Sequence, residues 1–225
     1  MHFQDMLWRD TLSFHSEGGE EMITEKHLPV FRVLDTESSH GRYSRTTKEI
    51  TFDDIVKFHG HPCDGLYRGV YALSVAFKHL FPDGIIDRTD TRSISRNSPC
   101  LGDAASYLTG SRIRFGTQDV MSEPGVWYIL QRISTGEAVK VSEESGFFPA
   151  EISDAEASVG SAAEDELPKM LDRLKDLQDS WVKNTLLKTR PENHYHAERI
   201  ELQWKEVPYA NKGKRTDIIF KDVIR

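Results

Sequence analysis

Two histidines and one of the chain's only two cysteines lie within positions 59–63. The other cysteine, Cys100, lies beyond the next predicted helix. Imidazole nitrogen and thiolate sulfur are the ligands that zinc and related transition metals prefer. We therefore expect His61, Cys63 and Cys100 to bind a divalent transition metal, with zinc the first choice. His59 is expected beside them, as a fourth ligand or as a catalytic base.

The number of ligands decides what such a metal can do. Three protein ligands leave a position open for water or a small-molecule substrate, whereas four ligands close the site and make it structural. A protein that delivers a metal or metal cofactor to an oxidoreductase would use the same ligands. Two interpretations without a shared metal also stay open: Cys100 as a nucleophile with a histidine base, or two unrelated cysteines that act as small apolar residues. Whether the protein is an enzyme stays undecided.

Two further residues are candidates for the chemistry around this site. Asp103 follows Cys100 on the same face of the predicted helix, where it can orient a ligand or move a proton. Arg96 belongs to a local concentration of arginines, and we expect it to bind an anionic group of a substrate. Most such arginines face solvent or form ion pairs, so the other three carry no assignment: Arg92, Arg112 and Arg114.

Strong helix signals surround the candidate ligands. Thr51 and Asp54 form a capping-box pattern, and Gly60 is the natural stop of a helix that carries His59 near its end. Asp64 is expected to cap the next helix, which extends to about Leu80. The third helix begins with a good N-cap and a proline at its first position, Ser98-Pro99, so Cys100 falls in its first turn. Free amides and the helix dipole stabilise a thiolate there.

The remaining pattern predicts an α+β fold with a mixed or antiparallel sheet packed with helices. We expect an N-terminal arm over 1–50, a core over 51–152, and an extension with a helix and a β-hairpin over 153–225. The individual elements expected are an extended segment over 89–97, a strand over 112–115, a hairpin over 125–142, a linker over 153–163, a helix over 164–187 and a closing hairpin formed by 200–204 and 218–220. The apolar stripe of the 164–187 helix is typical of a packing or dimer face.

Composition limits the class of protein. The 225 residues are 38% hydrophobic and 29% charged, with a formal net charge of -7, which is typical of a globular protein. An acidic balance argues against a broad nucleic-acid or anionic-membrane surface. No run of about 18 apolar residues exists to span a membrane. With no secretory pattern at the N-terminus, we expect a cytoplasmic protein whose two thiols are reduced.

Three motifs together resemble the FmdE family, proteins similar to the FmdE component of formylmethanofuran dehydrogenase. They are Phe58-His59-Gly60-His61-x-Cys63-x-Gly65-Leu66-x-x-Gly69, then Cys100-x-x-Asp103-Ala104, then Leu108-Thr109-Gly110. The resemblance covers about residues 50 to 150 and includes the hairpin at 135–139. It implies an α+β core, a metal bound near the His/Cys motif, and homodimers.

The chain departs from the family pattern in two ways. Members usually read Cys-Pro-Gly-Leu where this chain reads Cys63-Asp64-Gly65-Leu66, with Pro62 placed before the cysteine. Many members also carry a C-terminal four-cysteine zinc finger, whereas this chain has no cysteine after Cys100. Partner contacts made through that finger therefore do not transfer. The family name reflects an operon association and assigns no reaction to this chain.

Overall fold

A computed structural model describes residues 28–37 and 44–205. The described helices are α1 (Phe52–His59), α2 (Asp64–Leu80), α3 (Pro99–Thr109), α4 (Ala150–Val159) and α5 (Leu167–Asn184), with 3₁₀ turns η2 (Ile113–Phe115), η3 (Leu186–Lys188) and η4 (Pro191–Asn193). The strands are β1 (Phe31–Leu34), β2 (Lys48–Ile50), β3 (Ile85–Asp87), β4 (Thr91–Arg96), β5 (Gln118–Met121), β6 (Trp127–Arg132), β7 (Ala138–Glu143) and β8 (Tyr195–Ile200). The predicted α+β class is confirmed.

The strands form two sheets. The larger has the order β5-β4-β6-β7-β8, in which β4 and β5 are parallel and every other pair is antiparallel. The smaller has the order β2-β1-β3, with β1 parallel to β3. The predicted hairpin is β6 and β7, and β6 lies at the centre of the large sheet, as its two apolar faces indicate.

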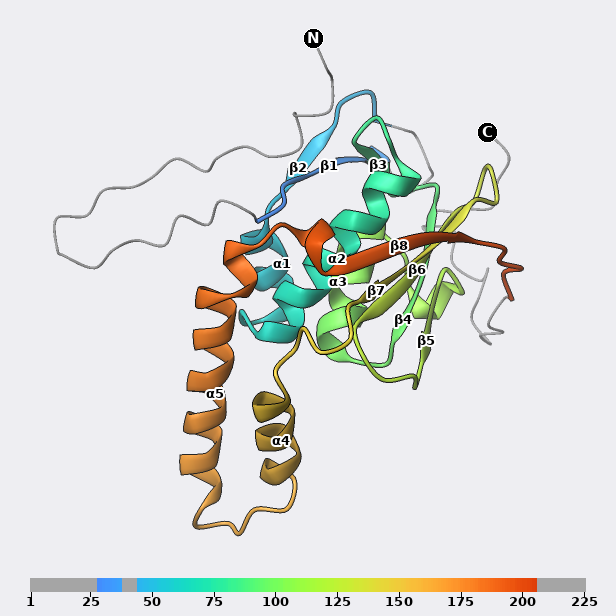
Figure 1. Cartoon of the computed structure of the whole chain (residues 1–225). Helices are drawn as coiled ribbons and strands as arrows, with labels where there is room; N and C mark the ends of the chain where they lie inside the picture. Colours follow the sequence, from blue (N-terminus) through green and yellow to red (C-terminus); the bar gives the residue numbers. More distant parts are fainter. Residues whose placement is uncertain (1–27, 38–43, 206–225) are drawn as a thin grey trace, which may run out of the picture.

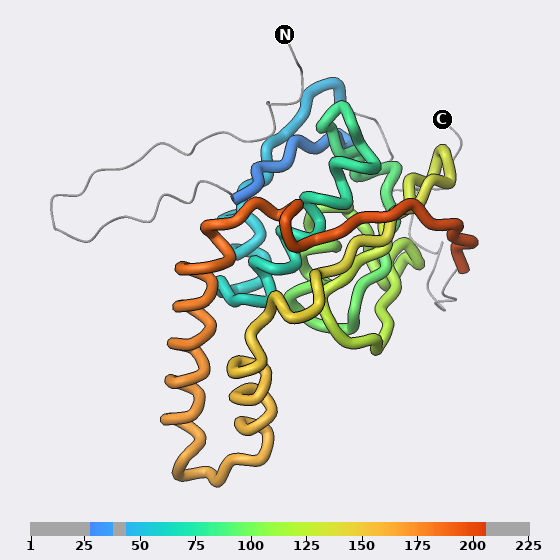
Figure 2. The backbone as a smooth tube through the Cα atoms, in the orientation of Figure 1, coloured from blue at the N-terminus to red at the C-terminus, as the bar shows by residue number. Residues whose placement is uncertain are grey.

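Three helices pack around the sheet and hold the core. The central one is α2, which contacts β6, β7 and β8 and is almost completely buried along its length. Next to it, α3 packs against α2 and β4, while α1 packs against α3. The helices α4 and α5 instead form a hairpin that extends away from the body, between β7 and β8 in the chain (Figures 1 and 2).

Local signals in the sequence fix the ends of the helices near the candidate ligands. The capping box at Thr51 is present, with both the Thr51 and the Asp54 side chains bonded to backbone amides. Gly60 closes α1 with a φ of 105°, a left-handed conformation that favours glycine. The cap of α2 is Cys63 and not Asp64, which takes the first helical position instead. The expected cap role of Asp64 was therefore wrong by one residue.

Two glycines on α2 allow α3 and the sheet to approach closely. A Cβ added to Gly69 would lie 2.6 Å from the Tyr128 hydroxyl and 2.9 Å from a Leu101 methyl group. A Cβ added to Gly65 would lie 3.1 Å from the sulfur of Cys100. The spacing of four residues places both glycines on one face of the helix. The same face therefore sets how near the start of α3 comes to the start of α2.

Two predicted elements were wrong. Residues 112–115 were expected as a strand but form the 3₁₀ turn η2, because the amides of Phe115 and Gly116 bond back to the carbonyls of Arg112 and Ile113. Residues 153–163 were expected as a linker, yet most of them belong to α4. Alanine and glutamate favour helix, and Ile152 anchors α4 in the core. Small, acidic composition alone is a weak sign of a loop.

The C-terminal part is only partly described. The expected long helix is α5, with shorter ends than predicted. The strand expected over 200–204 lies earlier in the chain, as β8, which pairs with β7 at the edge of the large sheet, while residues 201–205 are in no strand. The second strand of the expected closing hairpin, over 218–220, and most of the N-terminal arm lie outside the described residues. Among the described helices, none has a stretch long and apolar enough to cross a membrane.

Replacing Gly69 by alanine tests the packing of α2. The added methyl group meets Tyr128 and Leu101 at distances that force side chains or backbone to move, so Gly69→Ala is expected to lower the free energy of unfolding by roughly 1–3 kcal/mol. The matched control is Gly102→Ala in α3, where a Cβ meets nothing within 4 Å. That change is expected to be neutral or to stabilise by up to about 1 kcal/mol. Equal effects of the two changes in urea titrations would contradict this packing.

Candidate metal centre

Three helix ends bring the candidate ligands to one place. His59 is the last residue of α1, Cys63 is the N-cap of α2, and Cys100 lies in the first turn of α3. Between the first two lies a short turn that contains Gly60 and Pro62. The thiols therefore lie at two helix N-termini, whose amides and dipoles favour negative charge.

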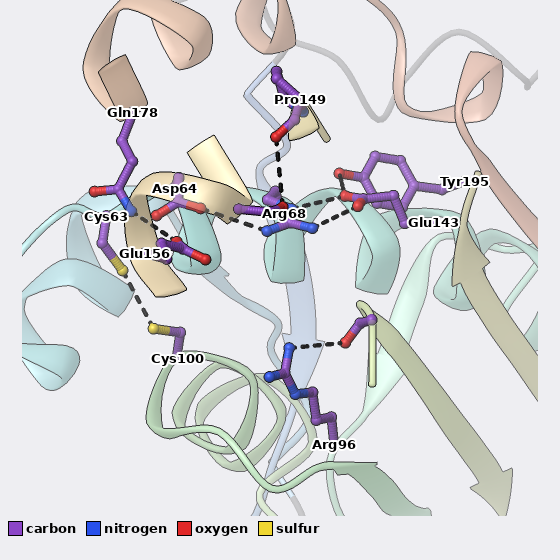
Figure 3. A network of polar contacts seen from close by, with 12 residues as sticks. Cys63, Asp64, Arg68, Arg96, Cys100, Glu143, Pro149, Glu156, Gln178 and Tyr195 are labelled. Carbon is purple, nitrogen blue, oxygen red and sulfur yellow. Dashed lines mark hydrogen bonds and ion pairs between the residues drawn. The ribbon is translucent and has the colours of Figure 1, made fainter. Parts of the chain in front are cut away.

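The two sulfurs are in contact. The Sγ atoms of Cys63 and Cys100 are 3.3 Å apart, although the residues belong to different helices (Figure 3). Both side chains are half-buried, and both are free thiols. Gly65 leaves room for the Cys100 sulfur at this position, since any Cβ there would press against it. The glycine in the sequence motif thus has a direct role in the shape of the site.

His59 joins this pair in a fixed orientation. Its Nε2 atom lies 3.7 Å from the Cys63 sulfur, and its Nδ1 atom lies 2.8 Å from a carboxylate oxygen of Asp103. Its side chain is only 5% exposed. In the tautomer whose Nδ1–H donates to Asp103, the Nε2 lone pair faces the Cys63 sulfur. Carboxylates commonly orient metal-binding imidazoles in this way.

His61 completes the cluster from the solvent side. Its ring lies 4.7 Å from that of His59, centroid to centroid, and the residue is exposed on the turn. The ligand atoms of His59, His61 and Cys63 all lie within 4.8 Å of one another. Cys100 is not part of this three-residue group but touches Cys63. The structure therefore groups His59, His61 and Cys63 as possible metal ligands, with the Cys100 sulfur in contact with that of Cys63.

The sulfur–sulfur contact shifts the pKa values of the two thiols in opposite directions. The pKa of Cys100 is lowered to about 6, mainly by hydrogen bonding with Cys63 and also by the nearby charge of His59, against the opposing effect of burial. The same contact raises the pKa of Cys63, as do burial and the thiolate charge of Cys100. The first proton leaves readily because the remaining S–H donates to the thiolate. The second leaves with difficulty because two thiolates would then be in contact.

The chain matches one known family over most of its described length. The family model described as "FmdE, Molybdenum formylmethanofuran dehydrogenase operon" matches residues 58–198. This chain belongs to the FmdE family. A search of curated protein sequences finds no match. Among solved structures, the chain is similar to a tungsten formylmethanofuran dehydrogenase FmdE-like protein from Syntrophus aciditrophicus, with 19% identity, a TM-score of 0.43, and coverage of 68% of this chain and 74% of the other.

In this FmdE-family protein a buried network of charges lies beside the thiols (Figure 3). Arg68 donates to both carboxylate oxygens of Glu143, at 2.9 and 2.6 Å, and more weakly to Asp64 at 3.5 Å. The Tyr195 hydroxyl donates to Glu143, and the Arg68 guanidinium lies 3.7 Å from the centre of the Phe148 ring. Burial alone would lower the pKa of Arg68, but the paired Glu143 raises it above its usual value.

This network was not predicted from the sequence. Asp64 and Arg68 have the spacing of a helical ion pair, four residues apart, and that signal was available. Glu143, however, comes from the end of β7, and its contact with Arg68 depends on how α2 crosses the sheet. Through this contact, the start of α2 is fixed to β7 and β8. The position of Cys63 therefore depends partly on strands that are distant in sequence.

The helical hairpin also contributes polar side chains near the site. Glu156 of α4 accepts a hydrogen bond of 3.0 Å from Gln178 of α5, on the side of Cys63 and Asp64 (Figure 3). Burial raises the pKa of Glu156, and the Asp64 charge raises it further, while the Gln178 bond and the charges of Arg68 and Arg96 oppose the shift. Glu156 was missed because its segment was expected to be a linker.

The remaining predicted site residues divide into two cases. Asp103 lies against His59, as described above. Arg96 is exposed at the end of β4, where its guanidinium lies 3.5 Å from the Gly125 carbonyl and outside the ligand cluster. Its charge acts on Glu156, so it borders the same region from the opposite side (Figure 3).

The lowered pKa of Cys100 gives a direct test of the thiol contact. In reduced, metal-free protein, the rate of Cys100 alkylation by iodoacetamide should rise with pH through a midpoint near 6, because the thiolate is the nucleophile. Cys63→Ala removes the hydrogen-bond donor and should move the midpoint up toward about 8.5, the ordinary thiol value. Cys63→Ser keeps a donor and should move it less. The same midpoint in all three proteins would contradict the contact.

Proposed function

We propose that this FmdE-family protein binds a zinc-type divalent ion at the cluster formed by His59, His61, Cys63 and Cys100. The observation that carries the proposal is the contact of two sulfurs from different helices beside two imidazoles. Thiolate and imidazole donors favour zinc over the hard cations magnesium and calcium. Such a site requires reduced thiols, which is consistent with a cytoplasmic location.

The four donors differ in how firmly they are held. His59 is buried and oriented by Asp103, and the thiols are packed at helix ends, so these three are proposed as fixed ligands. His61 is exposed on a short turn and is proposed as the fourth donor, which can yield its position to a small molecule. This arrangement favours a ligand role for His59 over a role as free base. When bound, zinc at an open position can polarise an oxygen or lower the pKa of water.

The residues around the cluster would then act on the small molecule. Arg96 is proposed to attract an anionic group, since it is exposed on the rim of the region and its contact with the Gly125 carbonyl is long, at 3.5 Å. Glu156, with its raised pKa, is placed to accept or donate a hydrogen bond from the other side. Asp103 is proposed to hold His59 in one orientation and to take part in proton transfer only through it.

Delivery of a metal or metal cofactor to an oxidoreductase is the second candidate. It is supported by the exposure of His61 and of the adjacent Phe58, whose side chain is 49% exposed beside the ligand turn. An exposed aromatic residue next to an exposed ligand suits transfer to a partner surface. Co-purification with a molybdenum or tungsten enzyme, together with fast exchange of the bound metal, would favour delivery over a resident catalytic metal.

A homodimer is also proposed, through the apolar stripe of α5 around Leu171. Leu171 is 46% exposed, whereas Leu174 and Leu177 of the same stripe are partly buried against the core. A second copy of the hairpin would cover this stripe.

Metal binding by single variants tests the ligand assignment. Reduced wild-type protein should hold zinc at one ion per site, measured by elemental analysis after anaerobic purification. Cys63→Ser and Cys100→Ser should lose the metal, because a hydroxyl is a poor substitute for thiolate. His59→Ala should also lose it, whereas His61→Ala should retain metal with weaker affinity. Loss in His61→Ala and full retention in His59→Ala would reverse the roles of the two histidines.

Two further variants separate the loss of a group that orients a ligand from general effects of mutation on metal affinity. Asp103→Asn should weaken metal affinity by about 10–100-fold, as loss of an orienting carboxylate commonly does. His79→Ala is the matched control, since His79 is an exposed histidine of α2 away from the cluster and should leave binding unchanged. A wild-type protein without stoichiometric metal would end the proposal.

Anion binding tests the role of Arg96. The cobalt-substituted protein should change its visible spectrum when azide enters the open position. Arg96→Ala should weaken azide binding by about fivefold, the effect of removing roughly 1 kcal/mol of attraction at a partly exposed site. Arg114→Ala, which removes an exposed positive charge from η2, serves as the control. Equal azide affinities in the two variants would exclude Arg96 from the site.

A further inference from the structure

The contact between the two thiols has a consequence beyond metal binding. Cys63 and Cys100 are the only cysteines of the chain, and their sulfurs are 3.3 Å apart with both side chains half-buried. A disulfide needs a sulfur–sulfur distance of about 2.05 Å, so the atoms must approach by a little more than about 1 Å. Partial exposure gives a small oxidant access to the pair.

We propose that Cys63 and Cys100 form a reversible redox pair, which closes to a disulfide in the metal-free protein and must be reduced before metal can bind. The metal half of this inference rests on the proposed function. Closure of the disulfide rests only on the positions of the two sulfurs.

The required movement lies in the side chains, because both backbones are held at helix ends. The Cys63 carbonyl accepts hydrogen bonds from the amides of Leu66 and Tyr67, and Cys100 lies in the first turn of α3. A Cβ at Gly65 would lie 3.1 Å from the Cys100 sulfur, so the absence of a side chain there leaves this sulfur room. We therefore expect the disulfide to close by movement of the two cysteine side chains.

A hydroperoxide can supply the oxidising equivalents that the disulfide needs. The Cys100 thiolate, favoured by the first turn of α3, attacks one peroxide oxygen and displaces hydroxide, which leaves a sulfenic acid. The Cys63 sulfur then attacks the sulfenic sulfur and displaces a second hydroxide. The two thiol protons convert both hydroxides to water. Two thiols and one hydrogen peroxide thus give one disulfide and two waters, with sulfur oxidised and peroxide reduced.

Formation of the Cys63–Cys100 disulfide would remove both thiolate ligands together. His59 and His61 alone offer two nitrogen donors, too few for a zinc-type site. Oxidation should therefore release the metal, and bound metal should in turn protect the thiols, because coordinated sulfur is less available for attack. The site would then hold metal only where the cell keeps thiols reduced.

The experiment treats reduced, metal-free full-length protein with hydrogen peroxide and follows free thiols and intact mass. Free thiols should fall from two per chain to none, with loss of two hydrogen atoms and a Cys63–Cys100 linked peptide after digestion. A thiol reductant should restore both thiols. Zinc-loaded protein should oxidise more slowly and release its zinc as the disulfide forms.

Two variants that each keep one cysteine serve as controls, and three results with the wild-type protein would contradict the redox pair. Cys63→Ser and Cys100→Ser, checked for folding by circular dichroism, should gain oxygen atoms or form linked dimers but no internal disulfide. Wild-type protein that gains oxygen atoms, links between chains or keeps both thiols would overturn the redox pair. If the disulfide forms while reduced protein binds no zinc, the proposed metal function fails and the thiol pair stands.

Discussion

The close approach of α2 and α3 is the constraint on which the site depends. Gly65 and Gly69 remove side chains from one face of α2, so that Cys100 and Leu101 at the start of α3 can lie directly against it. A side chain at Gly69 would collide with Tyr128 and Leu101, and one at Gly65 would press against Cys100. Because the sulfurs come from these two ends, backbone packing in the core determines whether they can share one ion.

The candidate site combines residues that are held by buried contacts with a histidine on an exposed turn. On the fixed side, the Arg68–Glu143 pair ties α2 to the large sheet, and Asp103 holds the ring of His59. On the adjustable side, the turn with His61 is exposed to solvent. A site with rigid ligands on one side and an adjustable ligand on the other can hold a metal while still admitting a small molecule or a partner.

The sequence was informative wherever a signal was local. The capping box at Thr51, the glycine stop at Gly60 and the proline at the start of α3 are each determined by their immediate neighbours, and each helix end lies where it was predicted. Those ends carry the candidate ligands. Local signals thus predicted which helix ends carry these residues, whereas the contact of the two sulfurs is set by the packing of α2 against α3.

Features that depend on long-range packing could not be predicted in the same way. Glu143 reaches Arg68 only because of the angle at which α2 crosses the sheet, and no local pattern encodes that angle. Glu156 was hidden in a segment whose small, acidic residues look like a linker but form a helix anchored by Ile152. The alternation at 112–115 is too short to distinguish a strand from a tight turn.

The central claim is that both thiols and imidazole bind one ion, and X-ray absorption at the zinc edge of the loaded, reduced protein tests it most directly. We predict two sulfur neighbours at about 2.3 Å and nitrogen neighbours at about 2.0–2.1 Å. A first shell with a single sulfur, or with none, would contradict this claim, because Cys63 and Cys100 would then not share the metal.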